Sequence, residues 1–216
     1  MKSNLVKSFV ISDIGYILLF IATVGDLVIP FLLAPFYKEY NHSTMVMSLL
    51  GNQHAPLQSV YNFWLIIAGF MLILGSLKLY TTYEPVSSIL SKILMMCVIF
   101  YAIGACILSG IFPIGETKGL TTLSEKIHGY GSVLGFCLLT FIPLIIGLLS
   151  IRSNEVLGGI ISFVFFGLAV LFFTLFIMAD KESFANTIIS NEGIWQRLSL
   201  LCMYAPLIMV SFKNIV

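Results

Sequence analysis

The chain has 216 residues, of which 59% are hydrophobic and only 10% are charged, and its formal net charge is +1. Soluble domains carry about 25% charged residues, so this composition excludes an ordinary soluble domain. The balanced charge offers no basic surface for nucleic acid, and no nucleic-acid partner is expected.

Runs without a charged residue are long enough to cross a bilayer. Residues 93–115 and 156–179 contain no Asp, Glu, Lys or Arg, and each run exceeds the roughly 20 residues that a membrane-spanning helix needs. Lipid offers no partner to backbone N–H and C=O groups, so the spans must be helical. The sequence therefore predicts an all-α, polytopic membrane bundle in one domain, 1–216, with six spans at 9–36, 58–80, 89–112, 128–150, 156–179 and 194–212.

Lysine and arginine give a weak indication of orientation. The side of the membrane that holds both predicted chain ends carries six of these residues, and the opposite side carries five. Cytoplasmic loops are enriched in Lys and Arg, so we expect both termini in the cytoplasm and the protein in the cell membrane. Most of the acidic residues then fall on the outer side.

Asp26 is the most informative residue because it lies deep within the first predicted span. An ionisable side chain in hydrocarbon is costly and indicates a functional site by default. Two interpretations remain open. Asp26 either takes part in ligand binding or proton transfer, or it joins two helices; in both cases we expect it to pair with Arg197 or His128.

Polar side chains gather in the outer half of the predicted bundle at helical spacing. Glu125 and His128 share a face of the fourth span, and Glu192 and Gln196 share a face of the sixth. Polar groups that face lipid are penalised, so each stripe is predicted to point inward. Together with Asp26 they predict a polar cavity that opens to the outer face.

The candidate site residues follow from this cavity. The candidates for catalysis are carboxylates and an imidazole, the groups that general acid–base chemistry uses: Asp26, His128 and Glu192. The candidates for binding are polar residues of the same half: Ser48, Asn62, Glu116, Lys126, Gln196 and Arg197. Of these, Arg197 is expected to hold a phosphate or carboxylate. The four cysteines lie within spans and show no CxxC spacing, so no metal site is predicted and no cofactor is identified.

Short motifs in a fixed order carry a resemblance to a known family. In chain order they are MVMSLLG at 45–51 followed by Pro56, YNFWL at 61–65, SGIFP at 109–113, GETK at 115–118, KIHGYGS at 126–132 and EGIWQRL at 192–198. With these motifs the chain resembles, over almost its whole length, the bacterial and archaeal membrane family catalogued as domain of unknown function 998.

The resemblance implies a six-span helical membrane protein and no settled activity. The family's motif positions correspond here to Ser48, Gly51, Asn62, Pro113, His128, Gln196 and Arg197. Many relatives carry an acid in the first or the last motif, where this chain has Leu49 and Gln196. The resemblance therefore supplies no carboxylate for a mechanism at those two places.

Three classes of function are compatible with the sequence. The first is binding or modifying a lipid or small amphiphile from the outer face, which leaves open whether the protein is an enzyme. The second is a structural or immunity-type membrane partner without chemistry. The third is a small-solute transporter, which needs polar groups through both halves of the membrane, whereas the inner half is predicted to hold few. The lipid bilayer is the one partner that the composition itself indicates, and the oligomeric state is left open.

Overall fold

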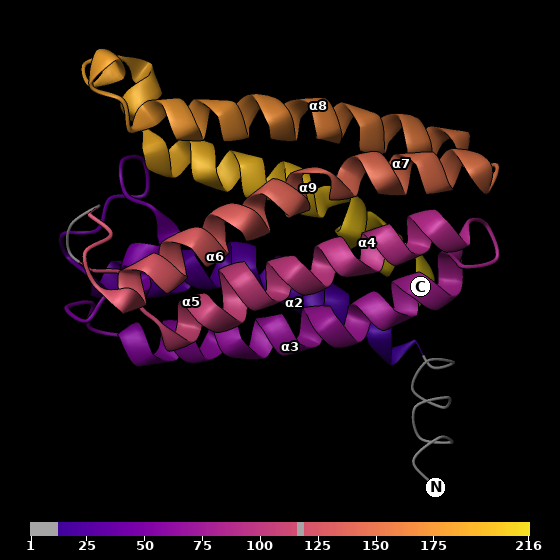
Figure 1. The fold of residues 1–216 in the computed structure, drawn as a ribbon, viewed down its shortest axis with the longest axis horizontal. Helices are drawn as coiled ribbons and strands as arrows, with labels where there is room; N and C mark the ends of the chain where they lie inside the picture. Colours follow the sequence, from indigo (N-terminus) through magenta and orange to yellow (C-terminus); the bar gives the residue numbers. More distant parts are fainter. Residues whose placement is uncertain (1–12, 116–118) are drawn as a thin grey trace, which may run out of the picture.

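The computed structural model describes residues 13–115 and 119–216 (Figure 1). Within these residues the chain forms helices and no strand, which confirms the all-α class. Six described segments are long and apolar enough to cross a membrane: Ile14–Phe36, Gln58–Tyr83, Ser88–Ile111, Leu123–Arg152, Val156–Ala179 and Glu192–Ile215. The six predicted spans are therefore confirmed, except that residues 9–12 of the first span lie outside the described part.

Three spans consist of more than one helical element. The first comprises α2 (Ile14–Leu33) and a 3-10 turn (Ala34–Phe36). The third comprises α4 (Ser88–Tyr101), a π-helical segment η3 (Ala102–Ile107) and α5 (Leu108–Ile111). The fourth comprises α6 (Leu123–Thr140) and α7 (Ile142–Arg152). The other spans are the single helices α3 (Gln58–Tyr83), α8 (Val156–Ala179) and α9 (Glu192–Ile215).

The fourth span begins at Leu123, ahead of its predicted start at residue 128. Thr122 and Glu125 form a capping box at this point. The Thr122 side chain accepts from the Glu125 N–H at 3.2 Å, and the Glu125 carboxylate accepts from the Thr122 N–H at 2.7 Å. The box satisfies two backbone donors that a helix start leaves unpaired, and so it extends the helix beyond the apolar run.

The two ends of the bundle differ in their connections. The short turns at 84–87 and 153–155 lie at the same end as the C-terminus, and we call this the turn end (Figure 1). Ion pairs join Lys78 to Asp13 at 3.7 Å and Lys213 to Glu155 at this end. The longer connections lie at the opposite end, which we call the loop end; their described residues are 37–57, 112–115, 119–122 and 180–191.

The fourth span is broken at Phe141, and its two halves pack against different neighbours. Pro143 stands at the second position of α7, where it cannot donate the backbone hydrogen bond that would continue α6. The α7 half packs on α8 and α9, whereas the α6 half packs on the third span. Figure 1 shows α7 running alongside α8, while α6 diverges from α8 toward the loop end. The break therefore separates α6 from α8 in the loop half of the bundle.

Glycines hold α6 close to the third span. A Cβ atom built on Gly131 would lie 2.9 Å from the carbonyl oxygen of Gly104, and one built on Gly135 would lie 2.9 Å from the Cβ of Ala105. The helices approach closely because these side chains are absent, as expected for a GxxxG motif. The hydroxyls of Ser109 and Ser132 also form a hydrogen bond of 3.0 Å across this contact.

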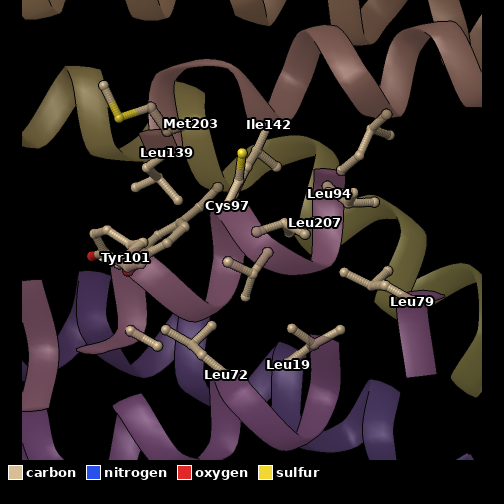
Figure 2. Close-up of a cluster of buried hydrophobic side chains, with 14 of the residues drawn as sticks. Leu19, Leu72, Leu79, Leu94, Cys97, Tyr101, Leu139, Ile142, Met203 and Leu207 are labelled. Atoms are coloured by element: carbon tan, nitrogen blue, oxygen red, sulfur yellow. Dashed lines mark hydrogen bonds between the residues drawn. The ribbon is translucent and has the colours of Figure 1, made fainter. Parts of the chain in front are cut away.

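The core lies between the second, third, fourth and sixth spans and α2. Figure 2 shows part of its main cluster, which includes Leu19, Leu72, Leu94, Leu139 and Leu207. These five side chains are at most 1% exposed. The fifth span is peripheral, because only 11% of its apolar window is buried, against 33–56% in the other spans. Most of α8 is therefore available to lipid or to a ligand.

Candidate functional site

A cavity of about 510 Å³ lies in the loop half of the bundle, where α6 and α8 diverge. Val133 and Phe136 of α6 line it on one side, and Phe173 and Ile177 of α8 line it on the other. Residues Val46–Ser48 of the first long loop cover it from the loop end, and α9 and Asp26 of α2 form its inner wall. The sequence predicted a cavity in this half of the bundle, but not that apolar side chains would form most of its wall.

Three phenylalanines form a continuous aromatic wall in this cavity. The ring of Phe136 stacks on Phe173, with centroids 6.2 Å apart, and on Phe176, with centroids 6.5 Å apart. Phe136 also meets Tyr101 edge-on at 6.0 Å, and Tyr101 meets Tyr204 edge-on at 5.9 Å. The aromatic wall thus runs from the gap between α6 and α8 to the tyrosines beside Asp26.

Asp26 is only 3% exposed and is bound by two tyrosines. Its Oδ2 atom accepts from the Tyr204 hydroxyl at 2.9 Å and lies 3.5 Å from the Tyr101 hydroxyl. The two hydroxyl oxygens are 2.5 Å apart. The expected pairing of Asp26 with Arg197 or His128 is wrong, because the hydroxyls that contact its carboxylate belong to tyrosines of the third and sixth spans. Phenols bind a buried carboxylate by hydrogen bonds without supplying an opposite charge.

Trp64 lies next to this carboxylate on the side of α3. Its indole ring packs against Gly25, where an added Cβ would overlap the ring. The Trp64 indole is a side-chain donor to the Asp26 carboxylate, but its Nε1 atom and the Asp26 Oδ1 atom do not reach the geometry of a well-formed hydrogen bond. A buried donor and a buried acceptor that meet outside good geometry are each left incompletely satisfied, which is costly.

Arg197 fixes the first long loop to α9 and does not line the cavity. Its Nη1 atom donates to the carbonyl oxygens of Gly193, His42 and Met45 at 2.7, 2.8 and 3.1 Å. Its Nη2 atom donates to the Tyr40 hydroxyl. Oxygen atoms of the protein itself thus accept from Nη1 and Nη2, whereas the Nε atom is buried without a hydrogen-bond partner. The expected phosphate or carboxylate ligand of Arg197 stays a prediction.

Gln196 completes the attachment of this loop. Its Oε1 atom accepts from the backbone N–H of Met47 at 2.7 Å, and the N–H of Ile194 donates to the carbonyl of Ser43 at 3.1 Å. Met47 lies against the cavity. The start of α9 thereby holds the loop over the cavity as a cover.

Burial shifts the pKa values of His42 and Tyr40, which both pack beside Arg197. Burial lowers the pKa of His42, and the positive charge of Arg197 lowers it further. Burial raises the pKa of Tyr40, against the opposing effect of Arg197. The His42 ring stacks on Phe31 at 4.7 Å, and its Nδ1 atom is buried without a hydrogen bond. This environment favours neutral His42 and neutral Tyr40.

His128 lines the cavity from α6 and also anchors the end of the third span. It is 6% exposed, and its Nδ1 atom lies 3.0 Å from the carbonyl oxygen of Phe112. A carbonyl oxygen only accepts, so Nδ1 carries the proton in this contact. The residue thus has a structural contact in addition to its predicted catalytic role, which stays a prediction.

The other candidates divide between the cavity and its surroundings. Ser48 and Glu192 line the cavity together with Asp26, His128 and Gln196. Asn62 instead donates to the carbonyl of Gly51 at 3.1 Å and supports the loop. Lys126 is exposed on α6. Glu116 lies outside the described residues.

Tyr101 and Tyr204 are the partners of Asp26 that the sequence interpretation missed. A tyrosine within an apolar span needs a partner for its hydroxyl group. Asp26 is a carboxylate within a span, so it is a suitable acceptor for such a hydroxyl. The need of each tyrosine hydroxyl for a partner was therefore the signal by which both residues could have been found. Nothing in the sequence indicated which faces of α6 and α8 would carry the aromatic wall.

The described residues contain few other reactive groups. Within 13–115 and 119–216, no three His, Cys, Asp or Glu side chains are placed to hold a metal ion. All four cysteines are free thiols; Cys97, Cys106 and Cys202 are buried, and Cys137 is exposed. Cys137 also lines the cavity, so the reaction rate of its thiol with an alkylating reagent can report whether a molecule occupies the cavity.

All the residues that line the cavity fall within the part of the chain that matches one protein family. Comparison with curated proteins and with solved structures gives no match. The family model described as "Protein of unknown function (DUF998)" matches residues 20–213, which include every residue named above as lining the cavity. This match confirms the resemblance carried by the short motifs, and the chain belongs to the DUF998 family of proteins of unknown function.

Proposed function

We propose that the protein binds a lipid or a small amphiphile in the cavity between α6 and α8. The observation that carries the proposal is the form of the cavity, which joins an aromatic wall at its side to a buried carboxylate at its inner end. Its volume of about 510 Å³ falls within the roughly 300–1,000 Å³ typical of small-molecule sites. An acyl chain fits the aromatic wall, and a polar head group fits the inner end.

Entry from the side supports an amphiphile over a water-soluble ligand. Tyr130 and Val133 on α6 and Ile177 on α8 line the cavity, yet they are 67%, 61% and 53% exposed. A residue that lines a cavity and is also exposed lies at its opening. In a spanning bundle this opening between two helices faces the acyl chains of the bilayer, which would let an amphiphile enter without crossing the head-group region. With the orientation expected from the Lys and Arg distribution, the opening lies in the outer leaflet.

Transport receives no support from the turn half of the bundle. Between Asp26 and the turn end the interior is filled by side chains such as Leu19, Leu72 and Leu79, which are at most 1% exposed. Ser76 and Ser91 in this region donate to carbonyls of their own helices. A solute would have to pass through this packed core, so binding fits the geometry better than transport.

The test uses alkylation of Cys137 by N-ethylmaleimide in the full chain, purified in a non-ionic detergent. We expect added 1-dodecanol to slow the alkylation, because the alcohol fills the cavity beside the thiol. Val133→Trp should abolish this protection by filling the opening. Leu134→Trp is the matched control, because Leu134 is similarly exposed at 55% and belongs to the same helix without lining the cavity.

The outcomes separate the alternatives. Equal protection in the two tryptophan variants would show that the cavity is not where the alcohol binds. Alkylation that no amphiphile slows in the unmodified protein would refute amphiphile binding and would favour a structural or partner role. The buried thiols of Cys97, Cys106 and Cys202 provide an internal measure of unfolding, because they react only if the bundle opens.

A further inference from the structure

We propose that the head group bound at the inner end of this cavity is a protonated amine and that Asp26 is its counter-ion. The inference rests on the proposed function and adds the chemical class of the ligand. It depends on three features of the cavity: the hydrogen bonds of Asp26, the charges on the wall, and the path from the opening to the carboxylate.

The two tyrosines leave Asp26 incompletely bound. Each phenol has one proton to donate. The Tyr204 hydroxyl donates its proton to Asp26 Oδ2 at 2.9 Å. The Tyr101 hydroxyl then donates its own proton to the Tyr204 oxygen, which lies 2.5 Å away. Tyr101 then has no proton left for its contact of 3.5 Å with Oδ2. The carboxylate thus receives one short hydrogen bond at Oδ2, and its other side-chain donor, the neutral indole of Trp64, makes no well-formed hydrogen bond to Oδ1.

The charge of Asp26 has no counterpart among the described residues. Asp26 makes no ion pair within 13–115 and 119–216, and the neutral groups around it, phenols and an indole, do not cancel a charge. An ionised carboxylate taken out of water is costly unless a cation accompanies it. Asp26 lines the cavity, so a ligand that brings a positive charge to its carboxylate from the cavity would remove this cost.

Beyond Asp26, the described wall of the cavity carries two further carboxylates and the imidazole of His128, but no Lys or Arg. Asp180 and Glu192 line it in addition to Asp26, although each of these two also interacts elsewhere within the protein. None of the described lining residues is Lys or Arg, and Arg197 is engaged by backbone carbonyls. Among the described lining residues, an anionic head group would meet the Asp26 carboxylate and no Lys or Arg to hold it, so fatty acids and phosphate esters are disfavoured.

The aromatic wall leads an alkyl chain to this carboxylate. Phe173 and Phe136 flank the gap between α8 and α6, Phe136 contacts Tyr101, and Tyr204 is hydrogen-bonded to Asp26. An amphiphile whose chain lies along the phenylalanines therefore carries its head toward Asp26. Aromatic faces along this path also favour a cation over an anion.

The experiment compares three probes that share one chain and differ in the head: dodecylamine, 1-dodecanol and dodecanoate. Each is titrated against the alkylation rate of Cys137 in the full chain at neutral pH. We expect dodecylamine to protect at a concentration at least about tenfold lower than dodecanol, the difference typical of one charge-assisted hydrogen bond. Dodecanoate should protect least.

Asp26→Asn tests the role of the carboxylate and preserves its shape. The variant should lose the preference for dodecylamine, while protection by dodecanol stays within about twofold of the unmodified protein. Asp180→Asn is the matched control, because it removes another carboxylate of the same wall, and it should retain the preference. If Asp26→Asn fails to fold, the comparison of the three probes on the unmodified protein still decides the head-group class.

The outcomes distinguish this inference from the proposed function. Protection by all three probes at similar concentrations, or best protection by dodecanoate, would refute the amine head group and leave amphiphile binding standing. A preference that disappears in Asp180→Asn and persists in Asp26→Asn would move the counter-ion to the opening and overturn the role of Asp26. Absence of protection by every probe would refute the proposed function itself.

Discussion

The Arg197 guanidinium donates to the carbonyl oxygen of His42 at 2.8 Å, although 155 residues separate the two in sequence. This bond joins the first turns of α9 to the loop that covers the cavity. The carbonyls of Met45 and Gly193 share the same Nη1 atom. The cover is therefore held chiefly by one cation and by backbone oxygens, and its stability should depend on that cation.

Replacing Arg197 tests this attachment. Arg197→Ala should lower the free energy of unfolding by about 2–4 kcal/mol, because it removes charged hydrogen bonds and leaves the partly buried carbonyls of His42 and Met45 without their cationic donor. Arg197→Lys should recover only part of the loss, since an ammonium lacks the planar fork of donors. Thermal unfolding in detergent measures both changes. Arg152→Ala is the control: Arg152 is an exposed arginine of the turn end, and its Nη1 atom donates to the Ser87 hydroxyl at 3.2 Å. This variant should change stability little. A similar loss in both alanine variants would show that Arg197 does not specifically hold the loop.

The two tyrosines beside Asp26 should contribute unequally. Tyr204→Phe removes the donor to Asp26 and the acceptor of Tyr101, whereas Tyr101→Phe leaves the bond from Tyr204 to Asp26 intact. We expect Tyr204→Phe to cost about 1–3 kcal/mol and Tyr101→Phe clearly less. A double-mutant cycle on unfolding free energies measures the coupling. Equal and additive losses would argue against the donor chain from Tyr101 through Tyr204 to the carboxylate.

The close approach of α6 to the third span depends on a missing side chain. Gly104→Ala should destabilise the bundle by about 1–3 kcal/mol, because the added methyl group would press on the backbone carbonyl of Gly131 and force the helices apart. Gly167→Ala provides the matched control, since an added Cβ there has no neighbour within 4 Å. Thermal midpoints of the two variants give the comparison, and a Gly104→Ala variant as stable as Gly167→Ala would show that the contact tolerates a methyl group.

The loop should become less stable in acid because of His42. Its pKa is lowered in the folded protein, first by burial and then by the charge of Arg197, so the unfolded state binds more protons below its ordinary pKa of about 6.5. The stabilising contribution of neutral His42 is fully present above that pH and is lost as the pH falls below it. Thermal midpoints between about pH 7.5 and 5.5 should therefore fall more steeply in the unmodified protein than in His42→Gln.

A second histidine of the same loop serves as the control for this pH dependence. His54 is exposed, and His54→Gln is the comparison variant because it replaces a histidine of this loop and leaves His42 in place. If His42→Gln retained the full dependence instead, another group would be responsible for it.

The spans could be predicted from the sequence because hydropathy and length act locally along the chain. The start of the fourth span at Leu123 was recoverable from Thr122 and Glu125, whose spacing is that of a capping box, but the charges before His128 favoured a later start. Asp26 was identified for the same local reason, as a carboxylate in an apolar run. Its partners were not, because a charge pattern favours Arg197 over uncharged tyrosines from distant spans.

The role of Arg197 could not be predicted from the identities of the side chains. Its partners are backbone carbonyls of His42, Met45 and Gly193, and every residue of the chain carries such an oxygen. The position of the cavity also depended on the path of whole helices. Pro143 indicated a bend, but the direction of that bend is set by the packing of α7 on α8 and by the glycine contact of α6, which only the assembled bundle defines.

The break at Phe141 divides the fourth span into α7, which packs in the core, and α6, which lines the cavity. Substitutions in α7 alter the packed core, where each lost methylene group lowers stability. Substitutions in α6 at positions such as Val133 change the size of a space that already exists between diverging helices. The size of the cavity can therefore change without a matching loss of folding stability, because the residues that set these two properties lie in different halves of the span.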